Sequence, residues 1–367
     1  MKNILFKVLG LMFVLLVSCE KEDFLEPSNA DTDRVAGQID LSIPEIKKWY
    51  NEFNMGVLYE YHDTLDFAYA ASTDDASRIW ETVEIPMMRT IFEDTLGNMI
   101  PGNETLYEDY LLEAVKFYDT TLFKYFDPNG KIAEYMPYKV LISESIFSPS
   151  YVPGGAGTIL TESEERYSST SKNGLRVVYN PHSIVMTFNK DNVEGDIEGY
   201  TKDNFYIFLN RIISMHELYN EIPATFFSGK ATYYGQDMEI IYREEMDIEE
   251  EKNVYVFEKD WFYEKGFVDA QYFYGSGLRN FYQFYDEDGN RLPSYIKHEK
   301  ALVPGYEFVS DKFMDVRSYL NEMMFRDADE LLEFPENIQE NMKILIDYFE
   351  GMGVSILEMN PDLEVLN

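Results

Sequence analysis

Apolar residues recur along this chain with two different spacings, and the spacing distinguishes helices from strands. A helix is predicted from Ser42 onward, because Ser42 can cap it, Pro44 falls in its first turn and apolar residues follow at helical spacing. From residue 54 apolar residues alternate with smaller or polar ones, which predicts a half-buried strand over 55–61. A longer amphipathic stretch predicts a helix over 104–125, ended by the turn at 127–130.

Four further segments complete this pattern. Strands are predicted over 138–146 and 183–188, and helices over 204–221 and 336–350, the last capped by Gly351. Long helices with few short strands predict an α+β fold, in which the helices pack on a small mixed or antiparallel sheet. No repeat of solenoid period is present in the sequence, so a repeat architecture is not expected.

The start of the chain has the pattern of a secreted lipoprotein. Residues 1–18 combine a basic start with an apolar run that is too short to span a membrane, as in a signal peptide. Leu16, Val17 and Ser18 precede Cys19, an order that resembles the bacterial lipobox, in which the cysteine is diacylated and becomes the first mature residue. The alternative is a free cysteine after an ordinary signal peptide. Because several acyl chains hold a protein stably, we expect a lipid anchor at Cys19.

Residues 19–40 are predicted to form a flexible acidic tether, followed by one domain over 41–367. The tether is polar, has no apolar period and begins with acidic residues at Glu20, Glu22 and Asp23. This acidic start resembles the signal that sends lipoproteins to the outer face of the outer membrane in some Gram-negative anaerobes. A solvated linker on a lipoprotein that faces the periplasm is the alternative.

Composition narrows the range of partners and cofactors. The chain has 367 residues, 45 % of them hydrophobic, which excludes general disorder. Its 67 acidic residues against 31 Lys and Arg residues give a net charge of −36, which disfavours nucleic acid as a partner. The single cysteine excludes an internal disulfide framework and Cys-rich metal sites, and four histidines leave few ligands for a metal.

One short motif suggests a metal site that has lost a ligand. In the zinc motif H-E-x-x-H, two histidines one helical turn apart hold the metal and the glutamate polarises a bound water. Here His216 and Glu217 are present within the predicted helix, but Asn220 replaces the second histidine. His216 is therefore a candidate ligand and Glu217 a candidate general base, both expected to be vestigial. The alternative is a His-Glu pair that merely lies on a helix.

Several segments, in order, make the chain similar to the substrate-import-associated zinc metallohydrolase lipoproteins, a family of zinc metallopeptidases. They are Trp49, residues 54–59, the helix and strand before Ile142, the His216-Glu217 motif, and residues 265–268 and 343–349. The resemblance implies a zincin-like fold and an accessory role in peptide or glycan handling beside an outer-membrane importer.

The departures from the family pattern fall on the metal site. Asn220 replaces a histidine, and Arg279 to Gln283 stand where the family has a Glu-Asp-Phe-Ala-Glu-like acidic patch. We therefore expect a degenerate, inactive member that binds no cofactor, with zinc bound only if the site still functions.

A second hypothesis is a non-catalytic surface lipoprotein that binds glycans or peptides through aromatic platforms. Aromatic residues make up 16 % of the chain. Trp261 and Tyr272 lie in aromatic clusters whose rings could stack on sugars or peptide side chains, although tyrosine is also a common residue of strands and cores.

Overall fold

A computed structural model describes residues 33–62, 66–67, 85–146, 177–179, 183–247, 255–256, 259–269, 271–274, 277–278, 284–285, 291–292, 301–302 and 306–367. The chain divides into two units, residues 1–37 and 38–367. In the described end of the first unit, the Ala36 N–H donates to the Asp33 carboxylate over 3.0 Å. The predicted signal peptide over 1–18, the predicted anchor at Cys19 and the Arg279–Gln283 segment lie outside the described residues.

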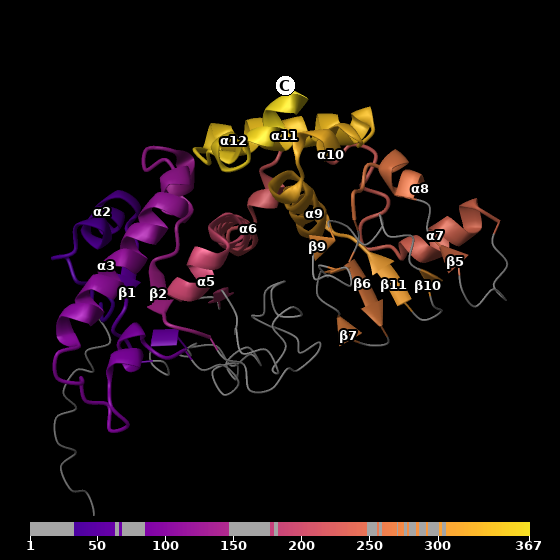
Figure 1. Ribbon diagram of the computed structural model, residues 1–367. Helices are drawn as coiled ribbons and strands as arrows, with labels where there is room; N and C mark the ends of the chain where they lie inside the picture. Colours follow the sequence, from indigo (N-terminus) through magenta and orange to yellow (C-terminus); the bar gives the residue numbers. More distant parts are fainter. Residues whose placement is uncertain are drawn as a thin grey trace, which may run out of the picture. The chain divides into compact units, whose positions relative to one another are not determined.

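The second unit contains helices and strands in alternation (Figure 1). Its described helices are α2 (Pro44–Phe53), α3 (Glu104–Thr121), α5 (Lys190–Gly195), α6 (Ile197–Met215), α7 (Met238–Glu245), α8 (Lys259–Glu264), α9 (Lys312–Phe325), α10 (Ala328–Leu332), α11 (Glu336–Met352) and α12 (Ile356–Met359). Short 3-10 helices are η4 (Met88–Phe92), η5 (Phe123–Tyr125), η6 (Lys131–Tyr135), η7 (Leu218–Asn220) and η9 (Pro361–Leu366). None of the helices in this described part is long and apolar enough to cross a membrane.

The strands form one four-stranded sheet and several smaller ladders. They are β1 (Gly56–Leu58), β2 (Lys139–Ser143), β3 (Val177–Tyr179), β4 (Ile184–Thr187), β5 (Tyr255–Val256), β6 (Gln271–Tyr274), β7 (Gly277–Leu278), β8 (Phe284–Tyr285), β9 (Arg291–Leu292), β10 (Ala301–Leu302) and β11 (Tyr306–Val309). The ladders β11-β6-β7, β10-β5 and β8-β9 are antiparallel.

The four-stranded sheet is mixed. Its order is β1-β2-β4-β3, with β1, β2 and β4 parallel and only β3 antiparallel to its neighbour. The α+β class predicted from the sequence is confirmed, but the antiparallel alternative is wrong for this sheet. The physical reason lies in the connections, since α3 falls between β1 and β2 and allows the parallel crossover that a tight hairpin cannot make. The central strands are buried at every position, as is usual in parallel sheets.

Three tyrosines connect α3 and α6 to the end of β4. The hydroxyl groups of Tyr118 on α3 and Tyr200 on α6 both donate to the Thr187 carbonyl, over 2.5 and 2.9 Å. The Tyr110 hydroxyl donates to the Phe188 carbonyl over 3.0 Å. These two carbonyls lie at and just past the end of β4, and the tyrosine hydroxyls provide them with hydrogen-bond donors while the rings fill the core. The two longest helices of the described chain, α3 and α6, are thus both bonded to the same end of strand β4.

Helix α6 is enclosed by aromatic residues on several sides. Phe208 is 1 % exposed, and its ring lies 5.6 Å from those of both Phe123 and Phe126. On another side Tyr206 contacts Phe325 of α9, with ring centroids 5.9 Å apart. Every residue of α6 from Asn204 to Ile213 is buried, including three polar ones, so this helix lies at the centre of the core.

Helix ends differ from the predictions in several places. Helix α3 ends at Thr121 and not at 125, and α6 begins at Ile197 and not at 204. Helix α2 begins at Pro44 with Ile43 as its N-cap, and the Ser42 hydroxyl donates instead to Asp40 over 2.6 Å. Helix α11 continues past Gly351 to Met352, and its C-cap is Gly353, whose φ of 91° favours glycine. A Cβ at Gly353 would lie 2.9 Å from the Cα of Gly130, so close packing also requires glycine there.

We expect Phe208→Ala to lower the free energy of unfolding by about 3–5 kcal/mol, because it leaves a cavity between rings that cannot fully collapse. Chemical denaturation monitored by circular dichroism would measure this change. Leu106→Ala is the matched control, since Leu106 is 56 % exposed on α3 and its truncation should cost less than about 0.5 kcal/mol. Equal effects of the two substitutions would contradict a core centred on α6.

Candidate functional site

The predicted zinc motif does not lie on a continuous helix. Helix α6 ends at Met215 with His216 as its C-cap, and Glu217 has the left-handed φ of 50°. A 3-10 turn, η7, follows and ends at Asn220. The expectation that His216, Glu217 and Asn220 share one helix is therefore wrong. The buried Leu218 lies between them, and its carbonyl accepts a hydrogen bond from the Tyr348 hydroxyl over 3.2 Å, so tertiary packing holds the chain in the broken form.

The three motif side chains are exposed, and Asn220 contacts both Glu217 and a lysine of α9. The Asn220 amide donates to the Glu217 carboxylate over 3.4 Å and accepts from the Lys312 ammonium over 3.5 Å. Lys312 comes from the first turn of α9, which also brings Phe313 to within 5.9 Å of the Tyr219 ring. A fixed cation beside the amide opposes a metal cation at the same position.

His216 lies against the ring of Tyr135, with centroids 5.1 Å apart. Partial burial lowers the pKa of His216, and the positive charge of Arg211 acts in the same direction, while a hydrogen bond with the Tyr135 backbone opposes both. The imidazole is thus biased toward its neutral form, but its partners are an aromatic ring, a main-chain group and a cation, not carboxylates.

This donor set does not fit a zinc ion. Among the residues that the structure describes, no three His, Cys, Asp or Glu side chains come together as possible ligands. A structural or catalytic zinc site needs at least three protein ligands in tetrahedral arrangement. The motif offers one imidazole, one carboxylate on a left-handed residue and one neutral amide that already pairs with a lysine.

The proposed aromatic platform at Trp261 is not available on the surface. Trp261 in α8 is 6 % exposed, and its indole N–H donates to Glu245 over 2.7 Å. Its ring contacts Tyr242 and Phe262 at centroid distances of 5.3 and 4.9 Å, so it serves as core for α7 and α8. Tyr272 pairs through its backbone with Phe308 between β6 and β11, and its side chain lies outside what the structure describes.

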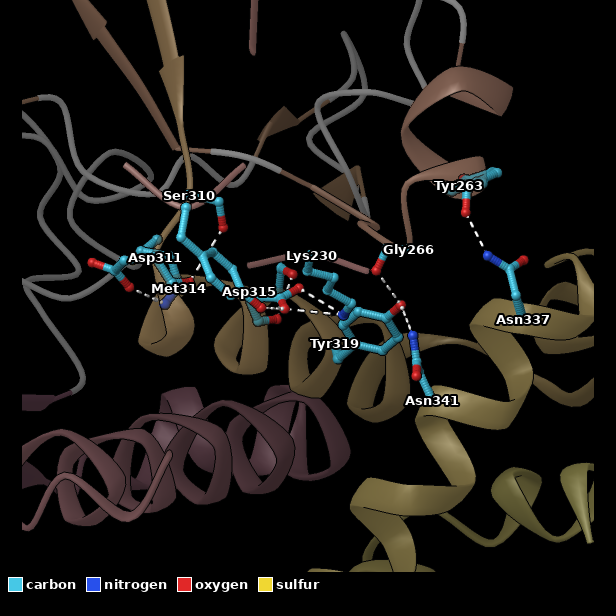
Figure 2. Close-up of polar contacts among 12 residues, drawn as sticks. Lys230, Tyr263, Gly266, Ser310, Asp311, Met314, Asp315, Tyr319, Asn337 and Asn341 are labelled. Carbon is cyan, nitrogen blue, oxygen red and sulfur yellow. Dashed lines mark hydrogen bonds and ion pairs between the residues drawn. The ribbon is translucent and has the colours of Figure 1, made fainter. Parts of the chain in front are cut away.

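A buried polar cluster that the sequence did not suggest is formed between α9 and the turn that contains Lys230 (Figure 2). The Lys230 ammonium is 3.3 and 3.0 Å from the two carboxylate oxygens of Asp315, and the side chains of both residues are at most 1 % exposed. The Tyr234 hydroxyl donates to Asp315 Oδ2 over 2.6 Å. This is a fully desolvated ion pair with one further donor.

Aromatic rings surround the ammonium end of Lys230. The nitrogen is 3.9 Å from the centroid of Phe226, 4.5 Å from that of Tyr319 and 5.5 Å from that of Phe267. Gly266 completes the enclosure, because a Cβ there would approach Lys230 Cε to 3.0 Å and its φ is 84°. Cation–π contact partly replaces the hydration that the ammonium loses.

The ring of Tyr319 is itself held in place from both sides. Figure 2 shows its hydroxyl between two partners: it donates to the Gly266 carbonyl over 2.7 Å and accepts from the Asn341 amide over 3.0 Å. The Tyr319 side chain thus links α9, on which it lies, to the turn at Gly266 and to α11. The enclosure of Lys230 is rigid as a result.

Burial governs the electrostatics of this cluster. It lowers the pKa of Lys230 and raises that of Asp315, and the attraction between the two groups opposes both shifts. Burial also strongly raises the pKa of Tyr234, so this hydroxyl keeps its proton and acts as a donor. Burial thus disfavours the charged forms of both side chains, and the contact between them favours those forms.

The sequence contains only a weak signal for this cluster. Asp315, Tyr319, Glu322 and Arg326 follow at helical spacing on one face of α9, and all four are buried. A periodic face that mixes acids and bases with a tyrosine looks like a solvated face. Lys230 lies in a turn-rich segment, where lysine is normally exposed, so only the tertiary structure reveals its burial.

A pocket of about 370 Å³ lies where the end of α3 meets the start of α6 and the C-terminal segment. It is lined by Thr120, Thr121, Lys124, Tyr125, Ile197, Glu198, Thr201, Lys202, Met359, Asn360, Pro361 and Asp362. Its charges balance, since the lining holds two lysines and two acids; Lys202 pairs with Glu198 over 2.9 Å, and Lys124 pairs with the nearby Glu358 over 3.5 Å. Its volume is in the range of small-ligand sites.

Comparison with protein-family models, with curated proteins and with solved structures finds no match to this chain.

We expect Asn220→His alone not to create a zinc site, because the helix still ends at Met215 and Lys312 still lies beside position 220. Metal analysis after equilibration with zinc and dialysis should show no zinc above the level of the unmodified chain. Adding Lys312→Ala to Asn220→His tests the contribution of the cation, and adding His216→Ala identifies binding elsewhere. One zinc per chain in the single variant, lost on adding His216→Ala, would contradict the geometry described above.

Proposed function

We propose that this protein is a lipid-anchored lipoprotein of the outer-membrane surface and a non-catalytic relative of zinc metallohydrolases. It has an accessory role in peptide or glycan handling beside an importer. The proposal that the protein is non-catalytic rests on the end of the helix at His216 and Glu217 and on the position of Lys312 beside Asn220. A base and its metal must be held in one geometry for hydrolysis, and the end of the helix at Met215 removes the one-turn spacing on which the motif depends.

The zincin-like ancestry is part of the same proposal. It is supported by the sequence resemblance, together with a central helix, α6, that packs near a small mixed sheet and ends at the degenerate motif. The anchor is supported by the lipobox-like order before Cys19 and by the acidic tether that follows.

A neutral polar ligand suits the pocket at the start of α6 better than a strongly charged one. The lysines and acids of the lining compensate each other, while threonine hydroxyls remain able to accept hydrogen bonds. Neutral oligosaccharides and short uncharged peptides have this chemistry. With Trp261 buried, this pocket replaces the aromatic platform as the candidate binding site.

The anchor is tested by Cys19→Ser in the native secretion system. The unmodified chain should partition with membranes and be released by detergent, and the variant should be found in the soluble fraction. Protease treatment of intact cells distinguishes a surface-exposed chain from one that faces the periplasm. Equal membrane partition of the two chains would contradict the lipid anchor.

Ligand binding is tested by a screen of neutral oligosaccharides and short peptides, followed by calorimetry on any compound that binds. Thr201→Trp should abolish binding because the indole fills the pocket that Thr201 lines. Thr225→Trp is the matched control, since Thr225 is exposed and lies outside the lining. Binding that survives Thr201→Trp would exclude the pocket, and a screen without any binding compound would contradict the accessory role.

A further inference from the structure

Lys230 and Asp315 form a pair of potentially reactive groups sealed inside the fold. The amine is a nucleophile when neutral, and the carboxyl carbon is an electrophile when the acid is protonated. Elsewhere in the described chain, the ion pair of Lys265 with Glu245 has a similar distance, 2.8 Å, but its side chains are 20 % and 40 % exposed. Water keeps such a surface pair ionised, whereas the buried pair has lost that stabilisation.

The geometry brings the nitrogen in front of the carboxyl group. Lys230 Nζ is 3.3 Å from Oδ1 and 3.0 Å from Oδ2, so the nitrogen is in direct contact with the group that would receive it. Two reactants that the fold already holds in contact do not pay the entropic cost of being brought together. The rings of Phe226, Tyr319 and Phe267 fix the nitrogen there.

Tyr234 provides the third element of the arrangement. Its hydroxyl donates to Asp315 Oδ2 over 2.6 Å, and Oδ2 is the oxygen on which negative charge would grow when the carbon is attacked. A donor aimed at that oxygen in a dry site stabilises the tetrahedral state, as an oxyanion hole does.

We propose that Lys230 and Asp315 condense within the folded chain to an intramolecular isopeptide bond. The Nζ–Cγ bond forms and the bond from Cγ to Oδ1 breaks. Oδ1 keeps the proton of the carboxylic acid, takes one proton from Nζ and leaves as water. Oδ2 becomes the amide oxygen and keeps its hydrogen bond from Tyr234. No oxidant, reductant or activated co-reactant is needed.

The medium favours this direction of reaction. In water, an amine and an acid ionise to ammonium and carboxylate, which do not condense, and the excess of water favours hydrolysis of the amide. At this site both groups are at most 1 % exposed and surrounded by rings, so water stabilises their charged forms less and is not in excess beside the new bond. The product also removes two buried charges, which relieves the desolvation cost of the pair.

The bond would link two positions that are 85 residues apart. The intervening chain contains α7, α8 and all the antiparallel ladders from β5 to β11. A covalent link between Lys230 and Asp315 would close this segment into a loop that stays closed when the rest of the chain unfolds. The inference is independent of the proposed function, because it depends only on the chemistry of the buried cluster.

The test is mass spectrometry of the full chain purified from its native secretion system and digested with protease under denaturing conditions. We expect a branched peptide in which Lys230 is joined to Asp315, lighter by one water than the two separate peptides together. Trypsin should not cleave after Lys230 in that species. Denatured wild-type chain should migrate faster in gels than Lys230→Arg, which cannot form the bond.

Two substitutions at Asp315 and one at Tyr234 test the chemistry. Asp315→Asn should give the same branched peptide, because the amide loses ammonia where the acid loses water, whereas Asp315→Ala should give none. Tyr234→Phe should slow formation after refolding by at least tenfold. Lys265 and Glu245, analysed in the same digest, should remain unlinked.

The proposal is overturned if the wild-type digest contains only separate peptides with Lys230 cleaved by trypsin. It is also overturned if the branched peptide persists in Asp315→Ala. An unchanged rate in Tyr234→Phe would exclude the role given to that hydroxyl. Because the wild-type digest decides the first point, the result does not depend on whether any variant folds.

Discussion

The enclosure of α6 is the constraint on which the rest of the described structure depends. Rings from the segment after α3 contact one side of this helix, and Phe325 of α9 contacts another. Tyr200 attaches its first half to the Thr187 carbonyl at the end of β4. A helix buried nearly all round fixes the position of every element packed on it, because close-packed interiors tolerate little displacement.

The end of α6 explains why His216, Glu217 and Asn220 do not lie on one helix. Leu218 turns into the core and Glu217 takes a left-handed conformation, which for a glutamate costs about 1–2 kcal/mol. Burial of Leu218 and its hydrogen bond from Tyr348 offset that cost. Lys312 of α9 reaches Asn220 just after this break, so the end of the helix and the cation beside the amide occur at the same place in the fold.

The buried cluster at Lys230 is also built on α9, the helix whose Phe325 contacts α6. Residues of α9 supply Asp315 and Tyr319, and α11 supplies Asn341. An ion pair of this kind contributes little net stability as such, since desolvation consumes most of the attraction. Net stability therefore does not explain why a buried ion pair lies among aromatic rings. The condensation of the two side chains would provide a specific chemical reason.

Much of the local structure follows from the sequence alone. Apolar spacing located α2, α3 and α11 and the strands β1, β2 and β4 to within a few residues, because local propensity and amphipathic pattern determine where such elements form. The same pattern overran the end of α6, since nothing in the spacing of residues 204–221 reveals that Leu218 must turn inward. The parallel pairing of β1, β2 and β4, the burial of Trp261 and the meeting of Lys230 with Asp315 were decided by tertiary structure. Each depends on contacts between distant segments, and a side chain's sequence neighbours do not determine whether water reaches it.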